Sequence, residues 1–323
     1  MRFKKIVALA VAGALTVASL AGCGKKEEAE VRVGVLKGPT GIGAVEIMDK
    51  SESGEYEKYS FTLTPDVQDI VAKLTNGDLD IGALPTNVAA TLYNKTSGDV
   101  RIIALNCLGV LYILENGDSI KSVADLKGKT IVTTGQGSNP EYVLNFILRK
   151  NGLEPGQDVT VEFKESSDVV TTMVSGKADV CMLPVPAATT VLAKNKNVRE
   201  ALDVTAEYDK VADDDSRLTM GSLVARKSFI DEHPDDIKLF LERYSKSIEH
   251  VLSDLDASAE LVAKYEIVGA AAIAKQAIPK CGIVCITGKD IKPAIEGYYK
   301  VLFEASPKAI GGAMPGDDFY YEK

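Results

Sequence analysis

Two segments of this chain share a pattern of residue types at a constant separation of 99 positions. Leu74–Pro85 reads LTNGDLDIGALP and Met173–Pro184 reads MVSGKADVCMLP, so a glycine, an aspartate, a β-branched residue and a Leu-Pro pair recur in order. Upstream, Asp69-Ile70-Val71 matches Asp168-Val169-Val170 at the same separation. Two copies are too few for a solenoid, which needs three or more repeats. The repeat therefore predicts two lobes of similar architecture.

Each copy begins with a strand that leads into a glycine-rich loop. Valines at 31, 33 and 35 alternate with other residues, and residues 129–134 are β-branched and bounded by glycine, both of which are typical of strands. The loops 38–41 (GPTG) and 135–140 (GQGSNP) follow, and each is followed by a helical pattern. Strands that alternate with helices predict an α/β fold with parallel-type sheets, right-handed crossovers and helices on both faces.

The pattern changes after the second copy. Residues 219–225 read as a strand, and the chain from Phe229 onward is largely helical, with an apolar stripe at helical spacing between Ile237 and Ile248. Such a stripe needs a partner surface, so we expect the chain to return to the first lobe. The predicted division is 31–113 plus 218–323 for lobe 1 and 114–217 for lobe 2, with crossing strands at 108–113 and 218–224 as a two-strand hinge.

The N-terminus has the organisation of an export signal. Arg2, Lys4 and Lys5 precede an apolar run over 6–20, which is shorter than the ~20 residues that span a membrane. Leu20-Ala21-Gly22-Cys23 resembles a bacterial lipobox, which implies removal of residues 1–22, a lipid on Cys23 and a tether over 23–30. The alternative is a plain secretory signal followed by an incidental cysteine. We expect a lipid-anchored protein on the extracytoplasmic face of a bacterial cell membrane.

Composition excludes several classes of protein. The length of 323 residues suits about two domains, and the formal net charge of −9 argues against nucleic acid and against adhesion to anionic headgroups. Five cysteines are too few for a disulfide scaffold. Cys107 and Cys181 lie in apolar segments and are expected to be buried. Cys281 and Cys285 would be about 13 Å apart on an extended strand, but a turn at Gly282 could bring them together, so a disulfide stays open.

Catalytic and metal-binding patterns are missing from the sequence. The two histidines, His233 and His250, lie in the C-terminal helical part with no Ser or Cys partner in a known arrangement. The chain contains neither a dinucleotide fingerprint nor a phosphate-binding loop with Gly-Lys-Ser/Thr, and no cluster with zinc spacing. We therefore expect no enzyme activity, no cofactor and no metal.

Two motifs resemble a known family. The run 118–131 (DSIKSVADLKGKTI) and the duplicated Gly-x-x-Asp-[Ile/Val]-x-x-Leu-Pro are similar to ABC-transporter substrate-binding lipoproteins of the nitrate/sulfonate/taurine and NMT1/THI5-like group. The resemblance covers 31–323 and implies a bilobed, type II periplasmic-binding-protein-like fold. The chain departs from thiamine-precursor members because it lacks their cysteine-rich loop, and its lack of tryptophan excludes an indole cage.

The resemblance also implies a function. A solute-binding lipoprotein of an ABC importer captures a small organic molecule between its lobes and passes it to a membrane permease. The ligand options are a sulfonate, an aminopyrimidine or a related small heteroaromatic or carboxylate compound, and the expected form is a monomer. A ligand sensor for a membrane partner is one alternative. A menaquinone-pathway-like enzyme on the same fold is another, although such enzymes are cytoplasmic and the lipobox argues against it.

Candidate ligand contacts follow from the position of loops in α/β sheets. Ligands bind beyond the carboxyl ends of strands, where helix N-termini present free N–H groups and partial positive charge. The predicted contacts are Gly38, Pro39, Thr40, Gly41 and Ile42 in the first loop, Thr86 and Asn87 after Leu84-Pro85, Asn106 in the strand before the crossing, Gly135, Gln136, Gly137, Ser138 and Asn139 in the second loop, Val185 and Pro186 after Leu183-Pro184, and Met220 and Gly221 at the return crossing.

Each of these positions also has an ordinary structural interpretation. Gly38-Pro39 and Gly135 are typical turn formers, Thr86 suits an N-cap, and Asn106 suits a buried polar group with satisfied hydrogen bonds. Lys37 is the one basic candidate in the first loop. Because charged residues are scarce in both loops, the sequence favours a neutral or singly anionic ligand.

Overall fold

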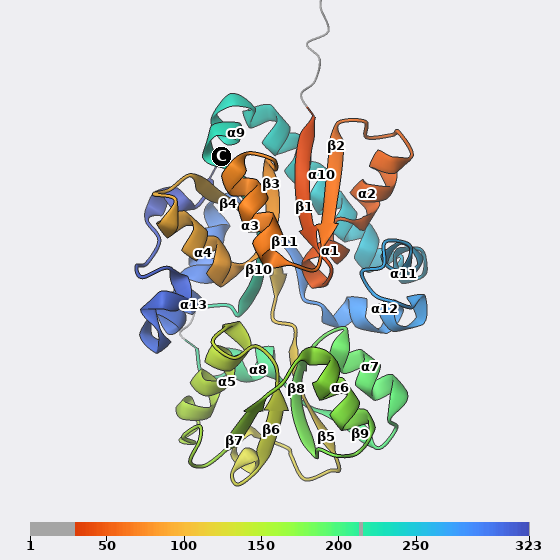
Figure 1. The fold of residues 1–323 in the computed structure, drawn as a ribbon, viewed down its shortest axis with the longest axis vertical. Helices are drawn as coiled ribbons and strands as arrows, with labels where there is room; N and C mark the ends of the chain where they lie inside the picture. The colour runs from red at the N-terminus through yellow and green to blue at the C-terminus, as the bar shows by residue number, and fades with distance from the viewer. Residues whose placement is uncertain (1–29, 213–215, 323) are drawn as a thin grey trace, which may run out of the picture.

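The computed structural model describes residues 30–212 and 216–322. The predicted signal peptide (1–22), the predicted lipidation site Cys23 and residues 23–29 of the predicted tether lie outside the described residues. Within the described ranges, the helices are all too short or too polar to cross a membrane. The chain forms two sheets flanked by helices, stacked along the long axis (Figure 1). We call the part around the six-stranded sheet lobe 1 and the part around the five-stranded sheet lobe 2.

The sheet of lobe 1 is mixed. Its strand order is β11 (Ile283–Thr287), β4 (Val100–Leu108), β10 (Thr219–Arg226), β3 (Ile81–Pro85), β1 (Val31–Leu36) and β2 (Tyr59–Thr64). β1 is parallel to β2 and β3, whereas β10 is antiparallel to β3 and β4, and β11 is antiparallel to β4. The prediction of parallel-type sheets therefore holds for the repeated strands only. The returning strand β10 enters the sheet from the other lobe and runs against its neighbours.

The sheet of lobe 2 repeats this arrangement. Its order is β7 (Thr160–Phe163), β6 (Thr130–Thr133), β8 (Val180–Pro184), β5 (Leu111–Asn116) and β9 (Val198–Asp203). β6 is parallel to β7 and β8, and β5 is antiparallel to β8 and β9. The strands β6, β7 and β8 thus correspond to β1, β2 and β3. In each lobe a crossing strand packs antiparallel beside the repeated unit, so the α/β fold with two similar lobes is confirmed.

Helices cover both sheets, and their sequences explain where they start and stop. The helix α3 (Val67–Asn76) begins at Asp66, whose carboxylate accepts from the Gln68 N–H at 2.8 Å, and it ends at Gly77 in the left-handed conformation. The apolar stripe predicted between residues 237 and 248 is buried on α10 (Pro234–Ser253). The remaining helices are α1 (Pro39–Ile42), α2 (Val45–Glu52), α4 (Thr86–Lys95), α5 (Asn139–Lys150), α6 (Ser166–Val174), α7 (Ala187–Lys194), α8 (Val204–Asp209), α9 (Lys227–Glu232), α10 (Pro234–Ser253), α11 (Leu255–Lys264), α12 (Ala271–Ala277) and α13 (Ile291–Ala305).

The chain passes between the lobes twice. Gly109-Val110 joins β4 of lobe 1 to β5 of lobe 2, and a Cβ at Gly109 would lie 1.9 Å from Thr205 Oγ1, so any larger residue there would force Thr205 to move. Because β5 pairs in the lobe 2 sheet from Leu111, we propose that the first boundary lies at Gly109-Val110, slightly before the predicted position. The second passage precedes Thr219.

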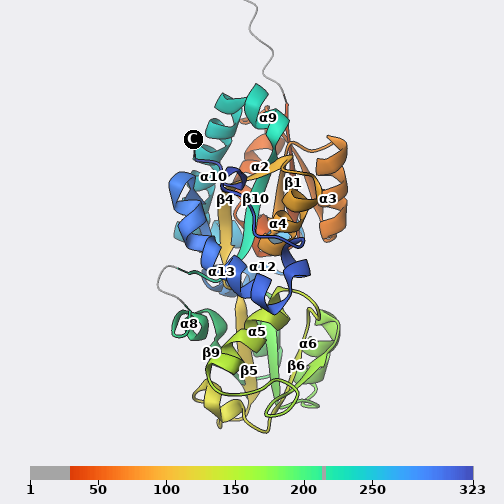
Figure 2. The ribbon, with the colours of Figure 1, turned by 90° about the vertical axis from the view of Figure 1, so that its left-hand side faces the viewer.

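Packing also connects the lobes outside these passages. α13 packs against α5, and α12 packs against α7; Figure 2 shows α13 and α5 where the lobes meet. The rings of Tyr208 on α8 and Tyr298 on α13 lie 6.0 Å apart edge to face, and Lys280 pairs with Glu200 of β9.

Candidate functional site

A cavity of about 400 Å³ lies between the lobes, beyond the carboxyl ends of β1 and β3. This is the edge at which the crossing strands leave the lobe 1 sheet. Most of its lining comes from lobe 1, and three consecutive residues come from lobe 2. The lining residues are Leu36, Lys37, Gly38, Pro39, Thr40, Val67, Pro85, Asn87, Val88, Cys107, Val110, Ser138, Asn139, Pro140 and Met220.

Two helices from different lobes begin at this cavity. α4 starts after Pro85 and α5 starts after Ser138, and neither N-cap side chain accepts a hydrogen bond from the first turn of its helix. The first N–H groups of a helix have no intrahelical acceptor, and the helix dipole adds partial positive charge there. The arrangement therefore offers N–H donors from both lobes to an acceptor or anion placed between them.

Asn139 adds a polar side chain to this end of the cavity. It is 3% exposed, and its Oδ1 atom is buried without a hydrogen-bond partner among the described residues. Buried amides are normally satisfied, and an amide oxygen only accepts hydrogen bonds, so the partner that Oδ1 lacks is a donor. Asn87, on α4, faces the same cavity from lobe 1. The two side chains line the same cavity from different lobes, and an anion between them would be bound through their Nδ2 donors.

Asn106 supports one of the loops that line the cavity. It is fully buried and does not line the cavity; its Nδ2 donates to the Thr40 carbonyl at 3.4 Å and to the Tyr244 hydroxyl at 3.3 Å. Burial raises the pKa of Tyr244 far above its usual value, so this hydroxyl stays protonated. The sequence prediction of a direct contact stays untested, but the hydrogen bonds show Asn106 fixing the loop that carries Thr40.

The walls of the cavity are apolar. The side chains of Leu36, Val67, Val88, Val110 and Met220 contribute to it, and none of the described lining residues is aromatic or carries a carboxylate. Lys37 is the one charged residue among those described in the lining, and its Nζ lies 3.3 Å from an oxygen of the exposed Glu266. The lining therefore combines aliphatic side chains with a few polar groups.

The structure brings together some of the predicted contacts and separates others. Those that line the cavity are Gly38, Pro39, Thr40, Asn87, Ser138, Asn139 and Met220; those that do not are Gly41, Ile42, Thr86, Asn106, Gly135, Gln136, Gly137, Val185, Pro186 and Gly221. Ile42 and Val185 are buried in the core. Thr86 is buried with its Oγ1 donating to the Thr219 carbonyl at 2.7 Å, which is a structural role.

Several lining residues were not predicted. Cys107 and Val110 look like core residues in the sequence, and they are 1% and 5% exposed although they line the cavity. Val67 and Pro140 sit in the first turn of their helices, a signal that could have identified them. Cys107, Cys181, Cys281 and Cys285 are free thiols, which leaves the two C-terminal cysteines unbridged.

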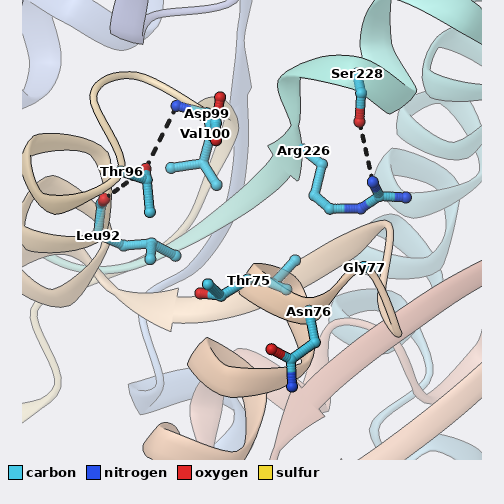
Figure 3. Close-up of a pocket in the computed structure, with 10 residues that line it drawn as sticks. Thr75, Asn76, Gly77, Leu92, Thr96, Asp99, Val100, Arg226 and Ser228 are labelled. Carbon is cyan, nitrogen blue, oxygen red and sulfur yellow. Dashed lines mark hydrogen bonds between the residues drawn. The ribbon is translucent and has the colours of Figure 1, made fainter.

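A second cavity of about 290 Å³ lies at the opposite end of the lobe 1 sheet (Figure 3). Two of its polar side chains already have partners: Arg226 donates to Ser228 Oγ at 3.0 Å and to Asp80 at 2.6 Å, and Thr96 Oγ1 accepts from the Asp99 N–H at 3.4 Å. The cavity between the lobes is therefore the stronger candidate. Residues 30–212 and 216–322 contain no group of three or more His, Cys, Asp or Glu suited to a metal ion.

The sequence is similar to a known protein family and to proteins described as binding proteins. Residues 100–257 match the family described as NMT1/THI5 like, which confirms the resemblance seen in the sequence. A Brucella abortus (strain 2308) protein, described as a presumptive binding protein, is 26% identical over 242 residues, covering 73% of this chain and 71% of its own. A Brucella suis biovar 1 protein with the same description has the same identity and coverage.

Solved structures with a similar fold include three proteins linked to transport or sulfonate binding. An ABC transporter protein of Parabacteroides distasonis has a TM-score of 0.77 at 20% identity, covering 91% of this chain and 99% of its own. The periplasmic aliphatic sulphonate binding protein of Escherichia coli has a TM-score of 0.70 at 20% identity, covering 88% and 90%. The alkanesulfonate-binding protein of Xanthomonas axonopodis, bound to MOPS, has a TM-score of 0.63 at 16% identity, covering 89% and 95%. The chain has the periplasmic-binding-protein fold.

Proposed function

We propose that this chain is the extracytoplasmic solute-binding component of an ABC importer and that it captures a small aliphatic anion between its lobes. The observation that carries the proposal is the cavity between the lobes, with an uncapped helix N-terminus from each lobe and apolar walls. The match to the NMT1/THI5-like family and the names of the relatives support it. The lining offers neither histidine nor carboxylate for acid–base chemistry, which supports binding rather than catalysis.

The lining favours one of the ligand classes left open by the sequence. An aminopyrimidine or another flat heteroaromatic compound would be held best by aromatic rings, and a cation would need a carboxylate. A sulfonate or carboxylate on an aliphatic body suits helix N-termini, asparagine amides and aliphatic walls. The Escherichia coli and Xanthomonas axonopodis relatives, named for aliphatic sulphonate and alkanesulfonate binding, support the sulfonate.

Capture requires the lobes to move. We propose that they close by bending where the chain passes between them, at Gly109-Val110 among the described residues, as hinged domains do. The closed, monomeric form would deliver the ligand to a permease. Lipid on Cys23, after removal of residues 1–22, would keep the protein at the membrane surface where that permease lies.

Calorimetry on residues 24–323 tests this function. We expect alkanesulfonates to bind, and Asn87→Ala and Asn139→Ala each to weaken binding about 10- to 100-fold, because each removes a hydrogen bond to a charged group. Asn145→Ala is the matched control, since Asn145 lies half-buried on α5 without lining the cavity. Sulfonate affinity that is unchanged in both variants, or an aminopyrimidine bound more tightly than any aliphatic anion, would show the site assignment to be wrong.

A further inference from the structure

The first turn of α5 carries a carboxylate, and the first turn of α4 does not. α5 begins with Asn139, Pro140 and Glu141, and Glu141 is the acidic residue of this turn, whereas the first turn of α4 contains no acidic residue. Asn139 and Pro140 line the cavity, and Glu141 follows them directly in the chain. An anion bound at the N-terminus of α5 would therefore have a negatively charged side chain close by.

Hydrogen bonds fix the position of the Glu141 carboxylate. Its Oε2 atom accepts from the Gly137 N–H at 2.6 Å, and the Tyr142 hydroxyl donates to the Gly137 carbonyl at 3.1 Å. Gly137 directly precedes Ser138, which lines the cavity. Standard bond lengths then place Glu141 Oε2 within about 8 Å of the Ser138 Cα atom. This separation is about one Debye length at physiological salt, so part of the charge of Glu141 is felt at the cavity.

The positive groups at the cavity suit a ligand head with one negative charge. A helix N-terminus carries the equivalent of about half a positive charge, so α4 and α5 together provide about one. Pro140 has no N–H, which removes one donor from the first turn of α5. Lys37, the one charged residue among those described in the lining, already faces Glu266. A second negative charge on the head would therefore lack a positive partner among the described lining residues and would be repelled by Glu141.

One other carboxylate lies next to the lining in the sequence. Asp66 precedes Val67, but its side chain is exposed and accepts the Gln68 N–H at the start of α3. In the proposed function the head lies at the N-termini of α4 and α5, not of α3. Of these two carboxylates, Glu141 is thus the one on a helix that would hold the head.

We propose that Glu141 restricts the ligand head to a single negative charge, so that the cleft accepts sulfonates and sulfate esters and rejects dianions such as phosphate esters. The inference rests on the proposed function and deepens it, because it places the head at the N-termini of α4 and α5. Coulomb energy is proportional to the charge of the head, so Glu141 opposes a dianion with twice the free energy with which it opposes a monoanion. The factor by which Glu141 weakens dianion binding is therefore the square of its factor for a monoanion.

A pair of esters with the same shape and different charge tests this. n-Butyl sulfate and n-butyl phosphate share a tetrahedral head and an alkyl chain, but at pH 8 the sulfate carries one negative charge and the phosphate two. Dissociation constants are measured by calorimetry at that pH, and the parent should bind n-butyl sulfate more tightly. Glu141→Gln keeps an oxygen for the Gly137 N–H and loses the charge. It should strengthen binding of n-butyl sulfate about threefold and of n-butyl phosphate about tenfold.

Glu154→Gln is the matched control, because it removes the same charge beyond the far end of α5, a helix about 18 Å long. Its affinities for both esters should stay within about twofold of the parent's, since the charge lies beyond a Debye length. Glu141→Asp keeps the charge on a shorter side chain and should keep the parent's preference for n-butyl sulfate.

Three results would overturn the inference and leave the proposed function standing. They are a parent that binds n-butyl phosphate more tightly than n-butyl sulfate, a Glu141→Gln variant that changes both affinities by one factor, and a Glu141→Asp variant that loses the preference. The last would show that the shape of the loop, rather than the charge of Glu141, decides which head is accepted. If the parent binds neither n-butyl sulfate nor any alkanesulfonate, the proposed ligand class is wrong and the inference falls with it.

Discussion

Glu115 on β5 provides a quantitative test of the packing of lobe 2. Its carboxylate is 3% exposed, accepts from Ser119 Oγ at 2.5 Å and the Ile120 N–H at 3.2 Å, and pairs with Arg199 Nη2 at 2.6 Å. Burial alone would raise the pKa of this carboxyl. The hydrogen bonds from Ser119, Ile120 and Arg199 outweigh burial and lower its pKa to about 2.

The pKa of Glu115 determines how much its ionised carboxylate stabilises the folded protein and how this stabilisation depends on pH. A fall from the ordinary value of 4.5 to about 2 corresponds to about 3 kcal/mol at 1.36 kcal/mol per pKa unit. Because the pKa is lower in the folded protein, the contribution is complete above pH 4.5 and is lost as pH falls towards 2. Glu115→Gln, which cannot ionise, should lower the free energy of unfolding by about 3 kcal/mol at pH 7.

Urea unfolding followed by circular dichroism between pH 7 and pH 3 measures this difference. The gap between parent and Glu115→Gln should narrow by more than 1 kcal/mol over that range. Glu154→Gln is the control, because its partner Arg149 is half exposed and such surface pairs contribute about 0–1 kcal/mol. A Glu115→Gln cost below 1 kcal/mol at pH 7, or a gap that stays constant with pH, would refute the reasoning.

Two further variants test the cleft. Gly221→Ala should lower the free energy of unfolding in urea by about 1–3 kcal/mol and also weaken sulfonate binding, because the new Cβ would displace Thr40 and Asn106. Unchanged stability and affinity would contradict the packing described. Lys37→Gln should weaken sulfonate binding only a few-fold at low salt, because Lys37 is partly exposed and already faces Glu266. The difference in affinity should vanish at about 0.5 M salt. A loss of affinity that persists at this salt concentration would indicate a direct, dehydrated contact between Lys37 and the ligand.

Much of the fold could be predicted because its signals are local. The repeated segments 74–85 and 173–184 end at β3 and β8, which occupy equivalent places in the two sheets. The apolar stripe of α10 is buried as its spacing indicates. The direction of the crossing strands could not be predicted, because β5 and β10 pair with strands distant in the sequence and their direction depends on the path of the whole chain between the lobes.

The loops that line the cavity were predictable from the sequence, and the individual lining residues were less so. Asn87 and Asn139 follow strands of different lobes, and the rule for α/β sheets places both at the cleft. Gln136 follows the same rule but does not line the cavity, since the orientation of lobe 2 decides which part of its loop faces lobe 1. Cys107 was not predicted because it is 1% exposed and its neighbours in the sequence are apolar, as they are for a core residue.

The most direct test of this account is a crystal structure of residues 24–323 grown with an alkanesulfonate of the best-binding length. The account predicts the sulfonate oxygens within about 3 Å of first-turn N–H groups from both α4 and α5. A sulfonate held by one lobe alone, or bound outside the space between the lobes, would contradict it.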